Sequence, residues 1–213
     1  PDSILFFRLG DFYEMFFDDA KLVSKELDLT LTTRDRNKPP EERTPMCGVP
    51  YHSCEGYIAR LIAKGYKVAI CEQTEDPATA KGLVDRDIIR IISPGTVISA
   101  SMLEEGKNNF LSAVYADESG VGLCLCDIST GEVFATSFPA GPEARDHLEN
   151  ELGRFHPTEA VLSEGAWALA GLTDFLKDRL DCMCQHWEEE GFSYVEHFAT
   201  DPALRGQGLG ARA

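Results

Sequence analysis

The sequence predicts an α/β protein with two domains: a small domain built on a mixed sheet, followed by a domain with a ribonuclease-H-like fold. Three observations lead to this prediction. Short strand-like segments alternate with helical periodicity in residues 1–98. Three apolar runs then precede a helix and one further strand, as at the start of a ribonuclease-H-like fold. Between these parts, residues 99–109 are polar, lack apolar periodicity and are predicted to be a linker.

The elements of the first domain follow from turn and cap residues. Two extended segments, residues 4–10 and 11–17, are separated by the turn Gly10-Asp11. Asp18 and Asp19 are typical N-cap residues for the helix that follows them. After that helix we predict a strand at 29–33, a polar loop at 34–44, a helix capped by Ser53 and ended by Gly65, a strand at 66–71, mostly loop with some helix at 72–87, and a strand at 87–92.

The second domain, residues 110–213, is expected to be truncated at its C-terminal end. Its apolar runs are joined by the short turn sequences DESG and STG, which is typical of an antiparallel meander. We predict meander strands at 110–115, 121–127 and 132–138, a helix at 142–155, a strand at 159–162, and helical or irregular segments beyond.

The composition is that of a globular protein with a strong acidic excess. The chain has 213 residues, 20 Lys and Arg against 36 Asp and Glu, and a net charge of −16, which at first argues against a nucleic-acid partner. The charge is uneven, however. Residues 1–98 hold 13 basic and 16 acidic residues, whereas residues 99–213 hold 7 and 20. The acidity therefore belongs mainly to the second domain and does not exclude DNA binding by the first.

The sequence also indicates the cellular setting. No apolar run approaches the roughly 20 residues of a membrane span, and no basic segment precedes residues 4–7 as in a signal peptide. The seven cysteines have no spacing typical of a disulfide framework. We therefore expect a cytoplasmic protein without a membrane partner.

An aromatic cluster is the strongest candidate for a functional site. Six aromatic residues lie between Phe6 and Phe17, and strand alternation cannot bury them all on one face. Phe12 and Glu14 are two residues apart on an extended segment and so share a face. An aromatic ring can unstack a DNA base step, and a carboxylate can bond to a base edge. Four positive charges follow, and they belong either to a solvated loop or to a basic patch that faces DNA. These residues are Arg34, Arg36, Lys38 and Arg43, and both interpretations stay open from the residues alone.

Several blocks of residues 4–98 resemble the mismatch-recognition domain of the MutS family of DNA mismatch repair proteins. They are GDFYEMFFDDA, LDLTLTTRD, TPMCGVPYHSCEGYIARLIAKGYKVAICEQTEDPATAKG and VDRDIIRIISPGT. FLSAVY and GLCLCDISTGEV more loosely resemble the connector domain of the same family.

The resemblance implies roles for particular residues. Phe12 would stack on a mispaired base, Glu14 would hydrogen-bond to that base from the minor groove, and Tyr13 would point into the domain. DNA backbone or groove contacts are implied for Arg34, Met46 and Arg86. The loop that holds Arg36, Lys38 and Arg43 departs from the family pattern, and these residues are the further candidates for DNA contact.

The resemblance also implies partners and cofactors. The expected partners are mismatched double-stranded DNA, the MutL protein docked on the connector domain, and a second copy of the chain in the full-length homodimer. We expect this chain to be no enzyme and to hold no cofactor, because it has no G-x-x-x-x-G-K-[ST] phosphate loop. We expect no metal, because its cysteines form no C-x-x-C pair and its histidines no H-x-x-x-H pair. ATP and Mg²⁺ are expected only in the full-length protein.

Other functions remain open from the residues alone. A metal-dependent nuclease could use Asp117 and Asp127 in the ribonuclease-H-like domain, although turn-flanking carboxylates are the simpler interpretation. A fragment without measurable DNA affinity is a second alternative.

The run Leu204–Gly210 resembles an acyl-CoA-binding loop, but the strands of that family are missing. Cys124 and Cys126 share a strand face and favour small buried hydrophobes over zinc ligands.

Overall fold

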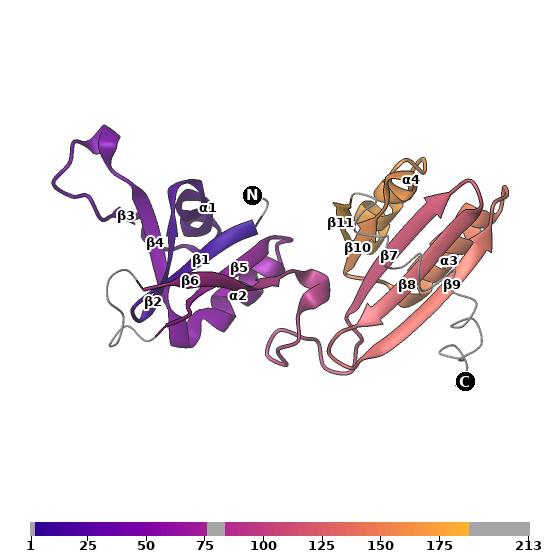
Figure 1. Ribbon diagram of the computed structural model, residues 1–213, viewed down its shortest axis with the longest axis horizontal. Helices are drawn as coiled ribbons and strands as arrows, with labels where there is room; N and C mark the ends of the chain where they lie inside the picture. The colour runs from indigo at the N-terminus through magenta and orange to yellow at the C-terminus, as the bar shows by residue number, and fades with distance from the viewer. Residues whose placement is uncertain (1–2, 76–83, 188–213) are drawn as a thin grey trace. The chain divides into compact units, whose positions relative to one another are not determined.

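The computed structural model describes residues 3–75 and 84–187. These residues form two compact units, each built on one mixed sheet (Figure 1). The first unit contains the described residues up to 94 together with 100–102, and the second contains 95–99 and the described residues from 103 onward. The chain therefore passes between the units more than once around the start of the predicted linker. Leu204–Gly210 lies outside the described residues.

The first unit has the mixed sheet that the sequence predicts, but with six strands, one more than expected. The strand order is β3-β4-β2-β1-β5-β6. β1 and β5 run parallel, whereas the other neighbouring strands are antiparallel. The strands are β1 (Ser3–Leu9), β2 (Phe12–Phe16), β3 (Thr32–Thr33), β4 (Pro45–Pro50), β5 (Lys67–Gln73) and β6 (Arg86–Ile92).

Two helices cover one face of this sheet. α1 (Phe17–Leu27) packs against β2 and β4, α2 (Cys54–Ile62) packs against β5, and the two helices contact each other. Each helix buries a stripe of apolar residues spaced three and four apart, the spacing that places them on one helical face. Phe6 and Met15 are fully buried beneath them. We call the opposite face, which none of the helices in residues 3–75 and 84–94 covers, the open face.

The start of α1 corrects the predicted cap. The helix begins at Phe17 and its N-cap residue is Phe16, so Asp18 and Asp19 lie in the first turn instead of capping it. The main-chain N–H of Leu5 donates to Oδ2 of Asp19 at 2.9 Å, which ties the helix to β1. Negative charge in the first turn still favours the helix through the helix dipole.

Strand β4 was not predicted from the sequence. Pro45, Gly48 and Pro50 all argue against a central strand. In the structure the two prolines occupy the ends of the strand, where a missing N–H disrupts the ladder least. The predicted strand at 29–33 shortens to β3, and β5 continues through Gln73 into the segment predicted as loop.

The second unit has the predicted ribonuclease-H-like arrangement. Its strand order is β11-β10-β7-β8-β9, with an antiparallel meander from β7 to β9 and with β10 parallel to both β7 and β11. The strands are β7 (Phe110–Asp117), β8 (Gly120–Asp127), β9 (Glu132–Pro139), β10 (Glu159–Leu162) and β11 (Met183–His186). The helix predicted at 142–155 is α3 (Ala144–Phe155), and the sequence did not predict β11.

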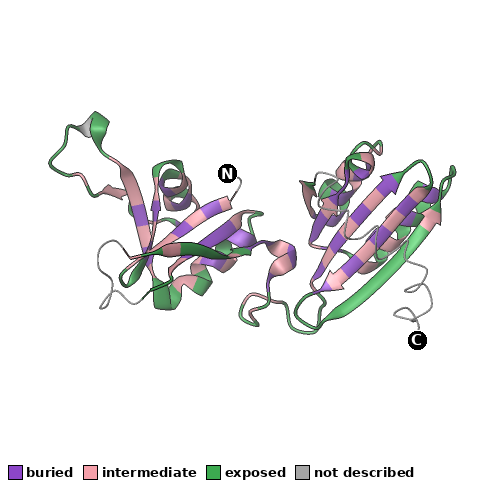
Figure 2. Ribbon diagram, in the orientation of Figure 1, coloured by how far each residue is buried: buried purple, intermediate pink, exposed green. Residues whose placement is uncertain are grey.

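The core of the second unit lies on one face of its sheet. Burial alternates strictly along β7 and β8, as the purple stripes in Figure 2 show. Leu148 and Leu152 of α3 join this core, together with α4 (Glu164–Trp167), α5 (Leu172–Asp174) and the π-helical segment Phe175–Arg179. Cys124 and Cys126 share the other face of β8 and are half-buried, so the expected burial of these small side chains is partial.

Over the described ranges, no helix combines the length and the apolar character needed to cross a membrane.

Candidate nucleic-acid interface

The β1–β2 hairpin places Phe12 at an exposed position. Gly10 has φ 57°, and Leu9 pairs with Phe12 across the two-residue turn. Phe12 is the first residue of β2 and is 47% exposed. Because side chains alternate along a strand, Phe12, Glu14 and Phe16 lie on the open face. The hairpin therefore presents an aromatic ring on a backbone that is fixed by its neighbouring strands.

Tyr13 anchors the hairpin from the other side of β2. It is buried, its ring centroid lies 5.9 Å from that of Phe6, and its hydroxyl donates to the carboxylate of Glu72. Burial, followed by the hydrogen bond to Glu72, raises the pKa of Tyr13 far above its usual value, so the hydroxyl keeps its proton. The expectation that Tyr13 points into the domain is confirmed.

Glu14 is largely covered on the open face. It lies opposite Gly48 of β4, where a Cβ would be in van der Waals contact with Cγ of Glu14 at 3.5 Å. Its Oε2 atom lies 3.4 Å from Nη2 of Arg34, is buried, and has no hydrogen-bond partner. The side chain of Glu14 is 14% exposed and that of Arg34 is 56% exposed. Glu14 thus depends on the charge of Arg34 for compensation.

Met46 lies on the same face as Phe12, whereas the guanidinium of Arg86 is engaged by the protein itself. Met46 is half-buried and pairs with Phe16, which puts it on the open face. The guanidinium of Arg86 donates to the carbonyls of Arg8 at 3.0 Å and Val84 at 2.7 Å. It therefore ties the start of β6 to β1 across the intervening β5, and a DNA contact would have to use the remaining donors of Arg86.

The basic loop between β3 and β4 extends away from the sheet (Figure 1), and its positive charges are not equivalent. Arg43 donates to the main-chain carbonyls of Lys38 at 2.8 Å and Arg36 at 3.1 Å, so it stabilises the loop itself. Lys38 lies 3.5 Å from Asp35. A hydrogen bond from Thr44, aided by the charge of Lys38, lowers the pKa of Asp35. Arg36 is exposed.

Two residues beside the site were not singled out from the sequence. Cζ of Arg8 lies 3.4 Å from the centroid of the Tyr51 ring, and its Nη1 lies 3.6 Å from Glu72. Together with Tyr13 they fix the base of the hairpin. The signal in the sequence is weak, because Arg8 and Tyr51 are brought together only by the pairing of β2 between β1 and β4.

Comparison with known families settles which family this hairpin comes from. The family model of MutS domain I matches residues 1–101, and that of MutS domain II matches residues 109–191. The chain belongs to the MutS family. The resemblance of residues 4–98 and of the second half is therefore confirmed, and each structural unit corresponds to one MutS domain.

Relatives named DNA mismatch repair protein MutS support the assignment. The relative from Ruminiclostridium cellulolyticum is 50% identical over 193 residues, or 91% of this chain and 22% of its own length. The relative from Pelotomaculum thermopropionicum is 56% identical over 162 residues, or 76% of this chain and 18% of its own length. The chain therefore spans about a fifth of the MutS proteins that it matches.

In MutS domain II, the two carboxylates considered for a nuclease lie at opposite ends of one hairpin. Asp117 pairs with Gly120 and Asp127 pairs with Phe110. The eight residues of β7 put these ends about 23 Å apart at 3.3 Å per residue. Each carboxylate accepts hydrogen bonds from its own turn, from Ser119 and from Ser129 respectively. The two cannot hold one metal ion together.

Asp127 instead stabilises the fold by accepting hydrogen bonds from the turn after β8 and from the segment before β7. It is buried and also accepts from Asn108 and from the main-chain N–H of Asn109. Burial alone raises the pKa of Asp127, but hydrogen bonds from Ser129, Asn109 and Asn108 outweigh it and leave the pKa lowered. Its stabilisation is thus present above the unfolded pKa of about 3.9 and is lost as the pH falls through the lower folded pKa.

We expect Asp127→Ala to destabilise the second unit by about 2–4 kcal/mol at pH 7, because several donors lose their acceptor. Below about pH 4 the difference from the wild type should narrow. Urea unfolding followed by tryptophan fluorescence measures this. Asp117→Ala is the matched control, since Asp117 makes the same kind of turn on an exposed site. Equal losses in both variants would contradict the prediction.

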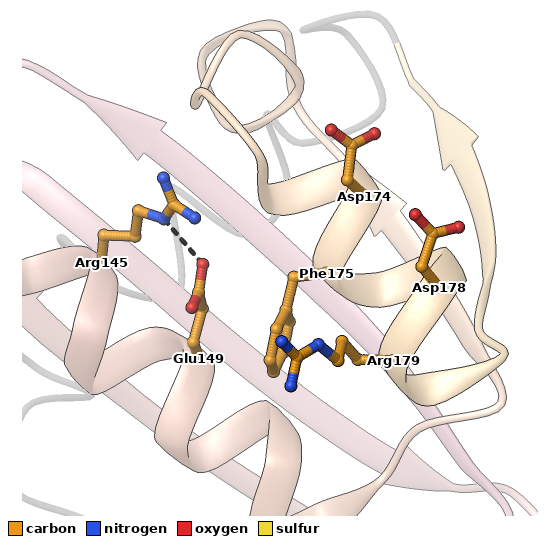
Figure 3. A pocket seen from close by; sticks show the side chains of 6 residues that line it. All are labelled: Arg145, Glu149, Asp174, Phe175, Asp178 and Arg179. Carbon is orange, nitrogen blue, oxygen red and sulfur yellow. Dashed lines mark hydrogen bonds and ion pairs between the residues drawn. The ribbon is translucent and has the colours of Figure 1, made fainter.

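One surface depression lies in MutS domain II, in the unit that does not contain Phe12. It has a volume of about 370 Å³ and is lined by Arg145, Glu149, Asp174, Phe175, Asp178 and Arg179. Figure 3 shows Glu149 and Arg179 near the ring of Phe175, whereas the carboxylates of Asp174 and Asp178 point away from it. Nε of Arg145 donates to Glu149 at 2.6 Å. The mixed charges favour neither a phosphate nor a cation, so this depression does not indicate a binding site for either.

Proposed function

We propose that the first unit recognises mismatched double-stranded DNA in mismatch repair. In this proposal Phe12 enters a base step as an aromatic wedge and Glu14 hydrogen-bonds to the mispaired base from the minor groove. The observation that carries it is the exposed ring of Phe12 at the start of β2, with Glu14 on the same face. The membership of the MutS family supports the class of DNA that is recognised.

The energetics explain how such a wedge could select mismatches. Inserting a side chain unstacks a base step and bends the duplex. Unstacking costs a few kcal/mol and costs least at a mismatched base. Bending a site adds about 1–6 kcal/mol, and flexible sites bend more cheaply. The protein would therefore select duplexes that are easily unstacked and bent, and would not read a particular base sequence.

Positive charge near the hairpin would supply the attraction to the backbone. Arg34 and Arg36 are exposed, whereas the guanidinium groups of Arg43 and Arg86 already donate to main-chain carbonyls. The first 98 residues still carry slightly more acidic than basic residues. Affinity for DNA should therefore be modest and should fall steeply with salt.

Direct binding tests this proposal. We expect the chain to bind a duplex with one mismatch more tightly than the fully paired duplex of the same length, at low ionic strength. Fluorescence anisotropy with each labelled duplex, and competition by the unlabelled other, measures the ratio of affinities. Equal affinities for both duplexes at every salt concentration would refute the proposed function.

For the second unit we propose the role of a connector that docks MutL and, in the longer proteins of the family, relays state to an ATPase domain of a homodimer. The acidic excess of residues 99–213, with 7 basic and 20 acidic residues, suits a protein partner better than DNA. Binding of purified MutL to the chain tests the docking, and no binding at low ionic strength would count against it.

A further inference from the structure

The carboxylate of Glu14 is a negative charge that is buried in the protein and that would also have to approach the negatively charged DNA backbone. A carboxylate that approaches a duplex meets the negative potential of the phosphates. Its Oε2 atom is already removed from water and accepts no hydrogen bond. A buried charge without a partner is costly. Among the described residues, the cation that an ion pair joins to Glu14 is Arg34, through Nη2 at 3.4 Å.

The strand arrangement allows this pair to form. Arg34 follows directly after β3, and β4 lies between β3 and β2. Gly48, the residue of β4 opposite Glu14, has no side chain, and a Cβ there would be in van der Waals contact with Cγ of Glu14 at 3.5 Å. The arginine can therefore meet Glu14 across an intervening strand, although the two residues are twenty positions apart in sequence.

We propose that Arg34 is a positioning residue for Glu14. It neutralises the carboxylate and holds it on the open face while the hairpin approaches DNA. This inference rests on the proposed function and adds to it a residue that acts on the base-reading group. A backbone contact alone would make Arg34 attract phosphates independently of Glu14. In our proposal the cost of losing Arg34 depends on whether position 14 carries a charge.

A double-mutant cycle with Arg34→Gln and Glu14→Gln tests this dependence. Affinity for the mismatched duplex is measured by anisotropy for the wild type, both single variants and the double variant. We expect Arg34→Gln to weaken binding about 30-fold when Glu14 is present and about threefold in the Glu14→Gln background. The tenfold difference corresponds to about 1.4 kcal/mol of coupling. Arg34→Lys keeps the positive charge, so it should recover most of the tenfold loss of affinity that depends on Glu14.

Arg36 provides the matched control. It lies in the same loop and is exposed, and no interaction joins its side chain to Glu14 in the described structure. Arg36→Gln should weaken binding by the same small factor in both backgrounds. The affinity of each variant is measured well below its own unfolding midpoint, which separates positioning from folding.

Each outcome decides the question. Equal losses on Arg34→Gln in both backgrounds, or no loss in either, would overturn the inference and leave the proposed function standing. Failure of the wild type to prefer the mismatched duplex would overturn both. A loss that is larger with Glu14 present, and that Arg34→Lys reverses, supports the inference.

Discussion

Phe12→Ala should remove most of the preference for mismatched over fully paired DNA, lowering the ratio of the two affinities by about 10- to 100-fold. Stacking of one base on an aromatic side chain contributes about 1–3 kcal/mol. Phe12 is half-exposed, so the folded protein loses little when the ring is removed. The loss should therefore appear in binding and leave the unfolding midpoint unchanged.

The control for this variant is Phe17→Ala. Phe17 is 65% exposed in the same unit but begins α1, beyond the residues of β2 that face outward with Phe12. We expect it to leave the ratio of affinities unchanged. Anisotropy with both duplexes, at matched salt, measures the two variants side by side. A wild-type ratio in Phe12→Ala, or an equal fall in both variants, would contradict the role of Phe12 as the wedge.

The exposed face of the hairpin could be predicted because it depends on local rules. A two-residue turn at Gly10-Asp11 fixes the register of β1 and β2, and alternation then separates Phe12 from Tyr13. The meander and β10 followed from the same rules, because their alternation and turn residues agree. Family resemblance added the roles of the side chains, which alternation does not give.

The ion pair of Glu14 could not be predicted, because it depends on contacts between distant segments. Arg34 reaches Glu14 only because β4 lies between β3 and β2, and β4 itself was missed on account of Pro45 and Pro50. The hydrogen bonds by which Arg43 and Arg86 stabilise the protein itself could not be predicted either. Their partners are main-chain carbonyls, which any residue offers and no sequence pattern marks.

Gly165→Ala should cause the largest loss of stability, about 3 kcal/mol or more in the free energy of unfolding of the second unit. Gly165 lies in α4, which packs on β7. A Cβ at this position would come within 2.0 Å of the carbonyl oxygen of Ala116 and 2.9 Å of its carbon. Main-chain atoms of a central strand cannot move aside as a flexible side chain can, so α4 itself must shift away from the sheet.

Gly153→Ala distinguishes this close approach from the general effect of replacing a glycine. Gly153 lies inside α3, and a Cβ there meets no heavy atom within 4 Å. Alanine in an exposed helix interior should stabilise the unit by about 0.5–1 kcal/mol. Trp167 of α4 and Trp187 both belong to the second unit, so urea unfolding followed by tryptophan fluorescence reports on it directly. A Gly165→Ala variant as stable as the wild type would show that α4 does not need its close contact with Ala116. A lower free energy of unfolding for Gly165→Ala together with a higher one for Gly153→Ala would establish that the close packing of α4 on β7 requires glycine.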